Sequence, residues 1–264
     1  MRLMISVVSA DEAHKAVQGG AEILDIKNPA EGSLGAQYPR VIREIKHLVS
    51  GKLEISAAIG DMPNLPGTAA LAALGAASCG PDYIKVGLHG SRNENEAAML
   101  LREVRRAVQE FETSVIAVGY GDFGRAGTLD PACLPGMVAS EGARGLLLDT
   151  AIKDGRSLLD FLDSTSLRRL GEQTHAAGLL FGLAGALREE HLAIARDLGA
   201  DVVGMRTAAC RNNLRSGPLD PARVRCLREA CLALGRKQNE NQGCCREGEI
   251  RSVCISRAAS PLTG

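Results

Sequence analysis

Two lysines lie at positions where a lysine is costly unless its amine is used. Lys27 closes the apolar run Ile23–Ile26, and Lys85 interrupts the run Tyr83–Gly87. Both runs predict short buried strands. Asp25 lies two residues before Lys27, and alternate residues of a strand point to one face, so an amine and a carboxylate share one interior space. A lysine whose pKa is depressed in such a space attacks carbonyls to form a Schiff base, and we expect this chemistry here.

A structural alternative stays open at this point. Lys27 and Lys85 are equally able to pair with Asp25 and Asp149 as ion pairs inside the protein, without any role in a reaction. The spacing of these residues does not separate the two interpretations.

Short apolar segments alternate with helical patterns along the first 235 residues. We expect strands over Leu3–Val8, Ile23–Ile26, Leu53–Ile59, Tyr83–Val86, Val115–Val118, Gly145–Leu148, Leu179–Leu183 and Asp201–Met205. We expect helices over Ala10–Gln18, Pro39–Leu48, Thr68–Ser78, Asn93–Phe111, Pro131–Ser140, Leu158–Ala177 in pieces, Arg188–Leu198 and Pro221–Leu234. Eight such alternations indicate an α/β fold, a (β/α)8 TIM barrel with eight parallel strands.

Local signals support these boundaries. Ser9-Ala-Asp-Glu12 has the form of a capping box, and a Gly-Ala pair at residues 20, 142 and 199 ends a helix and leads into a strand. An open doubly wound sheet is the second choice of fold. That fold usually has a GxGxxG turn after its first strand, and Val8-Ser9-Ala10 has none.

The composition limits the classes of partner. The chain has 264 residues with 31 basic and 31 acidic side chains, which predicts a small-molecule substrate and neither nucleic acid nor a membrane as partner. No apolar stretch reaches the ~20 residues of a membrane helix, and the first residues do not form a signal segment, so we expect a cytoplasmic protein. Barrels often associate through their helices, and we expect a homo-oligomer.

The last residues differ from the rest. Residues 1–235 are expected to form the catalytic barrel domain, whereas residues 236–264 are polar and aperiodic and are expected to form a flexible or loosely packed tail. Four of the eight cysteines lie from Cys231 onward without CxxC spacing, so we expect no metal site. We also expect no cofactor.

Catalytic groups of a parallel barrel come from the carboxyl ends of its strands. At those positions the sequence offers Asp25, Lys27, Asn28, Asp61, Lys85, His89, Tyr120, Asp122, Asp149, Lys153 and Arg206. Phosphate often binds at the loops after strands seven and eight, near helix N-termini. The candidates for phosphate binding there are Gly182, Ala184, Gly185, Gly204, Arg206 and Thr207.

Two loops near this site have a less certain use. The Gly-rich stretch Asn28–Ala36 follows Lys27 directly and is either a cover for the site or a plain connection. Asp61 opens a Pro-bounded loop at the mouth, and we do not expect it to be a catalyst.

Four sequence blocks resemble a known family. They are Asp25-Ile-Lys-Asn-Pro-Ala-Glu-Gly-Ser-Leu-Gly-Ala36, Tyr83-Ile-Lys-Val-Gly-Leu88, Leu148-Asp-Thr-Ala-Ile-Lys-Asp-Gly155 and Gly204-Met-Arg-Thr-Ala-Ala-Cys210. They are similar to blocks of the (5-formylfuran-3-yl)methyl phosphate synthases of methanofuran biosynthesis, over residues 1 to about 235. The chain departs from the family at Arg206-Thr207, where archaeal members tend to have Arg-Gly.

The resemblance implies a class I aldolase-like lyase that condenses two glyceraldehyde 3-phosphate molecules into a furan, with loss of phosphate and water. By this resemblance Lys27 is the Schiff-base lysine and Lys85 the general base, and Asp25, Asp149 and Lys153 are further charged residues of the pocket. Two alternatives remain: another Schiff-base aldolase acting on a sugar phosphate, and a non-catalytic barrel that binds a phosphorylated metabolite.

Overall fold

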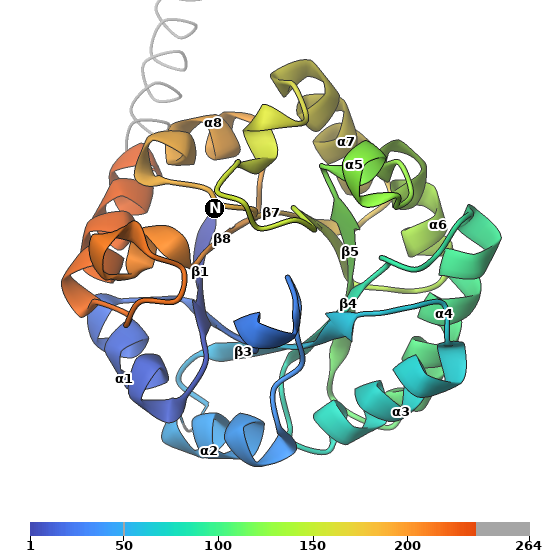
Figure 1. Cartoon of the computed structure of the whole chain (residues 1–264), viewed down its shortest axis with the longest axis horizontal. Coiled ribbons are helices and arrows are strands. Elements are labelled where there is room, and N and C mark those ends of the chain that lie inside the picture. The colour runs from blue at the N-terminus through green and yellow to red at the C-terminus, as the bar shows by residue number, and fades with distance from the viewer. Residues whose placement is uncertain (50, 236–264) are drawn as a thin grey trace, which may run out of the picture.

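The strands of the protein form one closed parallel barrel. A computed structural model describes residues 1–49 and 51–235 (Figure 1). Its strands are hydrogen-bonded in sequence order from β1 to β8, and β8 pairs with β1 to close the ring. The strands are β1 (Arg2–Val7), β2 (Ile23–Ile26), β3 (Glu54–Asp61), β4 (Tyr83–Gly87), β5 (Ser114–Tyr120), β6 (Gly145–Asp149), β7 (Leu180–Leu183) and β8 (Val202–Met205). The predicted TIM barrel is therefore confirmed.

Helices surround this barrel, as Figure 1 shows. They are α1 (Ala10–Gly19), α2 (Pro39–Val49), α3 (Pro66–Ala77), α4 (Glu94–Ala107), α5 (Phe123–Ala126), α6 (Leu134–Ser140), α7 (Ser164–Ala176) and α8 (Leu192–Asp197), and residues 221–235 are helical as well. Three of the expected helices begin with a separate 3-10 turn: η2 (Pro131–Cys133), η3 (Leu158–Asp160) and η4 (Glu189–His191). The segment over residues 236–264, predicted to be a tail, lies outside the described residues.

Several predicted boundaries differ from the structure. Helix α3 begins at Pro66, two residues before the expected start, because proline fits the first helical turn, where its missing N–H is not needed. Helix α4 ends at Ala107, well before the expected Phe111. Helix α5 is not predicted from the sequence, because a single helical turn carries no periodic pattern.

The predicted helix ends have the expected backbone geometry. Gly20, Gly142 and Gly199 have φ values of 88°, 69° and 84°, in the left-handed region that glycine adopts without strain. The Ser9 side chain accepts from Glu12 N at 3.3 Å. The Glu12 carboxylate, however, accepts from Val8 N at 3.1 Å rather than from Ser9, so only half of the predicted capping box forms.

The barrel interior is layered along its axis. Met4, Ile23 and Leu147 form part of a buried apolar cluster towards the amino ends of the strands. Two residues further along the same strands and on the same face lie Ser6, Asp25 and Asp149, which are all buried. Within the register of the sheet Ser6 is the direct neighbour of Asp25. The period-two alternation of the strands therefore places an apolar floor beneath a layer of polar side chains.

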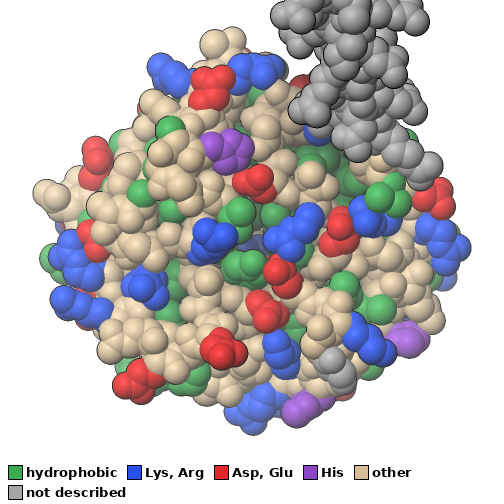
Figure 2. All heavy atoms as spheres, turned by 180° about the vertical axis from the view of Figure 1, so that it is seen from behind, with side chains coloured by type: hydrophobic (Ala, Val, Ile, Leu, Met, Phe, Trp, Pro, Cys, Tyr) green, Lys and Arg blue, Asp and Glu red, His purple; other side chains and the backbone are tan. Residues whose placement is uncertain are grey.

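On the face that Figure 2 shows, charged side chains of one sign do not gather into a patch. Figure 2 shows the face opposite to that of Figure 1, and on it basic and acidic side chains of the described residues are interspersed. An electrostatic footprint for nucleic acid would instead gather basic side chains on one face. In the described part of the chain, residues 1–49 and 51–235, no helix is long and apolar enough to cross a membrane.

A glycine in β4 gives a test of the packing at the barrel mouth. A Cβ at Gly87 would lie 2.1 Å from the Tyr120 hydroxyl and 3.1 Å from the Asp61 backbone, so we expect Gly87→Ala to lower the free energy of unfolding by about 1–3 kcal/mol. Gly75 of α3 has open space around it, and Gly75→Ala is expected to raise that energy by about 0.5–1 kcal/mol. Denaturant unfolding of both variants measures the two changes, and equal effects would contradict the packing described.

Candidate active site

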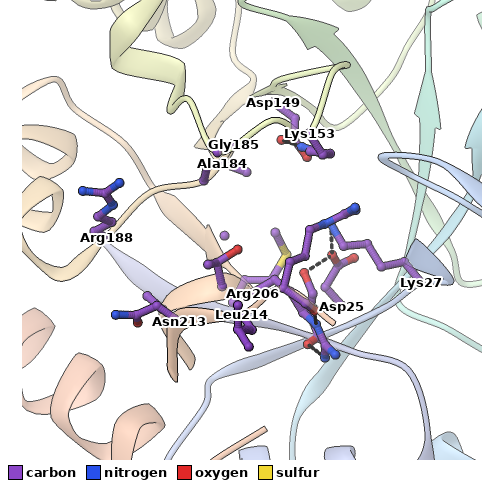
Figure 3. Close-up of a pocket in the computed structure, with 18 of the residues that line it drawn as sticks. Asp25, Lys27, Asp149, Lys153, Ala184, Gly185, Arg188, Arg206, Asn213 and Leu214 are labelled. Atoms are coloured by element: carbon purple, nitrogen blue, oxygen red, sulfur yellow. Dashed lines mark hydrogen bonds and ion pairs between the residues drawn. The ribbon is translucent and has the colours of Figure 1, made fainter. Parts of the chain in front are cut away.

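A cavity of about 540 Å³ opens at the carboxyl ends of the strands. The five side chains predicted to be catalytic all line it: Asp25, Lys27, Lys85, Asp149 and Lys153. Figure 3 shows Asp25 and Lys27 together on one wall and the pair Asp149 and Lys153 on another, with space between them. The cavity has the size of known small-molecule sites.

Asp25 is the carboxylate that the two buried lysines share. Lys85 Nζ lies 2.6 Å from Asp25 Oδ1, whereas Lys27 Nζ lies 3.9 Å from Asp25 Oδ2. Ser6 Oγ donates to Asp25 Oδ2 at 2.9 Å. The three charged residues are at most 5% exposed. Lys85 therefore forms the close ion pair, and the more distant Lys27 is the lysine whose amine is less engaged.

The surroundings of Lys27 favour its neutral form. Burial is the largest cause that lowers the pKa of Lys27, and the positive charges of Lys85 and Lys153 lower it further, against the opposite effect of Asp25 and Asp149. The result is a pKa of about 8 instead of 10.5. At pH 7 about one amine in ten is then neutral, compared with roughly one in 3,000 for an unperturbed lysine. A nucleophilic amine is thus available at this position.

The second charged pair lies on the loop after β6. Lys153 Nζ lies 2.5 Å from Asp149 Oδ1, and Thr150 N donates to the same oxygen at 2.8 Å. Burial alone would raise the pKa of Asp149, but Lys153 and Lys27 outweigh it and lower that pKa to about 2. Asp149 is therefore a fixed negative charge that keeps Lys153 at the cavity wall.

Asp122 positions the loop that carries Lys153. Its buried carboxylate accepts from Ala151 N at 2.6 Å and from Ile152 N at 3.0 Å. Both amides belong to the segment between Asp149 and Lys153. Sequence reasoning placed Asp122 at the mouth without a role, and the structure shows that it holds a neighbouring loop.

The loops after β7 and β8 supply small residues to the opposite part of the cavity. Ala184 and Gly185 after β7, Gly204 within β8 and Thr207 after it line this part of the cavity. Gly185 and Ala186 have φ values of 94° and 48°, so a non-glycine residue is held in the left-handed region at the cavity wall. Among the described residues, the amide groups of Gly185 and Ala186 have no protein acceptor. These amides are available to an anion.

Gly182 does not belong to this group. It lies within β7 rather than in the following loop, and it lines a small separate space of about 40 Å³ next to Ser56 and Tyr83. The predicted strand Leu179–Leu183 ends at the same residue as β7, so Gly182 was counted with the following loop only because a Gly-Leu-Ala-Gly run looks like a turn.

Arg206, which was predicted to clamp a phosphate, lines the cavity, and its guanidinium is engaged within the protein. Its guanidinium forms a buried ion pair with Glu12 and donates to Ser6 O at 3.1 Å and to Arg215 O at 3.1 Å. The donors of Arg206 are thus used within the protein, where they fix the segment after β8 to β1 and α1. Neither Arg206 nor Thr207 has a positive φ, so this backbone does not require the glycine that archaeal members tend to have.

A network that the sequence did not predict holds the loop after β2. Tyr120 Oη donates to Asp61 Oδ1 at 2.5 Å, and Leu34 N donates to Asp61 Oδ2 at 3.0 Å. Burial raises the pKa of Tyr120, and the Asp61 charge raises it further, so the hydroxyl keeps its proton. Ser33 Oγ also donates to Thr150 O at 2.9 Å.

The stretch Asn28–Ala36 is consequently a folded cover. Leu34 is fully buried, and the 3-10 turn η1 (Pro29–Glu31) lies over the centre of the barrel in Figure 1. Of the two interpretations of this stretch, the contacts favour the cover over a plain connection. Asp61 acts as its anchor, which no spacing in the sequence indicated.

No cluster for a metal ion is present among the described residues 1–49 and 51–235, where no three His, Cys, Asp or Glu side chains are suitably placed. His89 packs edge-on against the Tyr120 ring with centroids 5.6 Å apart and does not line the cavity. Its position at the end of β4 is therefore a packing position.

Comparison with known proteins now adds to this geometry. A family model described as 4-HFC-P synthase matches residues 3–228. The chain belongs to the 4-HFC-P synthase family. It is 49% identical to the (5-formylfuran-3-yl)methyl phosphate synthase of Methanopyrus kandleri over 87% of this chain and 98% of that protein. It is 43% identical to the enzyme of the same name from Methanocaldococcus jannaschii, over 88% and 100%. Because it matches nearly the full length of proteins named as synthases, this 4-HFC-P synthase family member is an enzyme.

Solved structures resemble this 4-HFC-P synthase family member in fold. The 3-hexulose-6-phosphate synthase of Salmonella typhimurium has a TM-score of 0.62 at 18% identity, covering 89% of this chain and 100% of its own. The phosphoribosyl anthranilate isomerase of Thermus thermophilus has a TM-score of 0.60 at 19% identity, with 89% and 100% covered. At these identities the similarity shows the barrel and nothing about the reaction.

The anchor of the cover gives a testable prediction. Tyr120→Phe removes the hydroxyl that donates to Asp61, leaving one carboxylate oxygen buried without its donor, so we expect a loss of about 1–3 kcal/mol of unfolding free energy. Amide exchange over residues 28–36 should also become faster. Tyr38 is exposed, and Tyr38→Phe is the control with no expected change. Unchanged exchange in Tyr120→Phe would show that the cover does not depend on this bond.

Proposed function

We propose that the enzyme condenses two glyceraldehyde 3-phosphate molecules into (5-formylfuran-3-yl)methyl phosphate, in methanofuran-type cofactor biosynthesis. The atoms balance when one inorganic phosphate and two water molecules leave. The observation that carries this proposal is the buried Lys27 amine, which faces the cavity with a pKa of about 8. The names of the relatives support the furan phosphate as the product, and the Lys27 amine supports a Schiff base as the intermediate.

Lys27 is proposed to form the Schiff base. Its neutral amine attacks the aldehyde carbon of one triose, and the resulting hydroxyl leaves as water to give an iminium ion. The iminium withdraws electrons from the adjacent carbon, whose C–H bond becomes acidic. Loss of that proton gives an enamine, which is the carbon nucleophile of an aldol step.

Lys85 and Asp25 are proposed to move the protons. Lys85 Nζ and Asp25 Oδ1 are 2.6 Å apart, so the carboxylate stabilises the ammonium that forms again when the Lys85 amine accepts a proton from the substrate. The ammonium donates to the hydroxyl that leaves, and the neutral amine then accepts the proton from carbon. The arrangement supports the division of roles between Lys27 and Lys85 that the resemblance implies.

The remaining predicted site residues are proposed to bind phosphate or to hold its neighbours. The unpaired amides of Gly185 and Ala186 and the loop of Gly204 and Thr207 form one anion site next to Ala184. Lys153, held by Asp149, faces the same cavity and is proposed to act on the leaving groups.

Borohydride trapping tests the proposal. Reduction in the presence of glyceraldehyde 3-phosphate should leave a secondary amine at Lys27, located by peptide mass spectrometry, and Lys27→Arg should show no adduct. Lys85→Arg should keep the Lys27 adduct while turnover falls on the order of 10²- to 10⁴-fold, the usual range for a lost proton-transfer group. An adduct at Lys85 would invert the roles, and no adduct in the wild type would refute the Schiff base.

The product separates the rival activities. Only the furan synthase converts glyceraldehyde 3-phosphate alone into a conjugated aldehyde, which absorbs in the ultraviolet. Another Schiff-base aldolase would give an adduct without this absorbance, and a non-catalytic barrel would give neither.

The pH dependence follows from the pKa of Lys27. Because that pKa is lowered to about 8, the neutral fraction of the amine rises about tenfold per pH unit up to pH 8 and then levels off. We expect kcat/KM to follow the same ascending limb. A limb that continued to rise to pH 10 would show that the attacking lysine is not perturbed in this way.

A further inference from the structure

Arg215 is a cation at the cavity whose guanidinium forms no ion pair with the described residues. It belongs to the segment after β8, is half-buried and lines the cavity together with Lys27 and Lys153. The contact that its side chain makes is a hydrogen bond from Nη2 to Gly32 O at 3.3 Å. Within the described residues 1–49 and 51–235, no carboxylate lies within 4.0 Å of its guanidinium.

Neighbouring arginines are in a different situation. Arg206 is paired with Glu12, Arg188 lies 3.6 Å from Glu190, and Arg211 lies 3.8 Å from Asp220. The lysines of the cavity also have carboxylate neighbours, because Lys85 pairs with Asp25 and Lys153 with Asp149. Arg215 therefore differs from the other cations around the cavity mouth in having its charge uncompensated by a close ion pair.

The position of Arg215 is separate from the anion site of the β7 loop. A Cβ at Gly185 would lie 3.0 Å from Thr150 N, so that site adjoins the loop after β6. Arg215 instead bonds to Gly32 of the cover, which follows β2. The carboxylates of Asp61 and Asp149 act on the guanidinium only from a distance, and burial lowers the pKa of Arg215. The cavity thus has two anion-binding groups that are held by different neighbours, the Gly185 amide beside the loop after β6 and the Arg215 guanidinium at Gly32 of the cover.

The proposed reaction brings two phosphate groups into one cavity. Each carries roughly −1.5 to −2 charges near neutral pH, and two such groups repel one another unless separate cations neutralise them. One set of amides accommodates one phosphate. A planar guanidinium with free N–H groups suits the other, because it donates two parallel hydrogen bonds to a phosphate.

We propose that Arg215 binds the phosphate of the second triose, the one that is not held by the amides of Gly185 and Ala186. This inference rests on the proposed function, since it needs two phosphorylated substrates in the cavity. Arg215 Nη2 donates to Gly32 O, which leaves further N–H groups of the guanidinium for the phosphate. Arg215 therefore joins the bound substrate to the cover.

Three variants test the role of Arg215. Arg215→Gln removes the charge, Arg215→Lys keeps the charge without the planar fork, and Arg211→Gln is the matched control, because Arg211 lies in the same segment, is exposed and does not line the cavity. Each is compared with wild type for furan formation from glyceraldehyde 3-phosphate and for the mass of the borohydride-trapped adduct at Lys27.

We expect Arg215→Gln to keep the adduct that carries one triose at Lys27, to lose the adduct that carries two, and to raise KM on the order of 10- to 100-fold. Arg215→Lys should recover part of this loss, and Arg211→Gln should equal wild type. If the wild type forms the Lys27 adduct and the furan, and Arg215→Gln has an unchanged KM, the role of Arg215 is overturned while the proposed function stands. A wild-type enzyme without any adduct would instead refute the proposed Schiff base. Loss of the one-triose adduct in Arg215→Gln would place Arg215 at the first phosphate and overturn the inference.

Discussion

The site depends on one carboxylate shared unequally by two buried amines. A lysine inside a barrel loses its hydration, and its charge persists only where a carboxylate lies close. Asp25 lies 2.6 Å from Lys85 and 3.9 Å from Lys27, so one lysine gains most of the compensation. Without Asp25, the buried Lys85 would lose its close carboxylate partner, and Lys27 would lose the nearer of its two. The Lys27 amine has the more distant carboxylate, and burial lowers its pKa to about 8.

The surrounding loops are built to keep this arrangement in place. Asp122 fixes the amides before Lys153, and Asp61 fixes the cover through Leu34 N and Tyr120 Oη. Arg206 fixes the segment after β8 through Glu12 and backbone carbonyls. In each case a charged side chain lies at the end of a strand or loop and holds the backbone of a neighbour. Several charged residues at the barrel mouth therefore hold the loops that carry the side chains of the cavity.

The sequence predicted the barrel and its charged pairs for a clear reason. Strands such as Ile23–Ile26 are short, apolar and followed by helical patterns, and the period of two places Asp25 and Lys27 on one face whatever the exact strand ends are. The network of Asp61, Tyr120 and Leu34 could not be predicted, because its members lie far apart in sequence and meet only through the closed ring. Gly182 and Arg206 show the same limit: their residue types suit a phosphate loop, but strand length and a distant Glu12 decide where they lie.

The most direct test of this account is the titration of the buried lysines by NMR, with isotope-labelled lysine in the wild type and in Lys27→Met. The account predicts one resonance that titrates near pH 8 and disappears in Lys27→Met. A Lys27 resonance that titrated near 10.5, as an unperturbed lysine does, would contradict the claim that burial lowers the pKa of this amine and makes it a nucleophile.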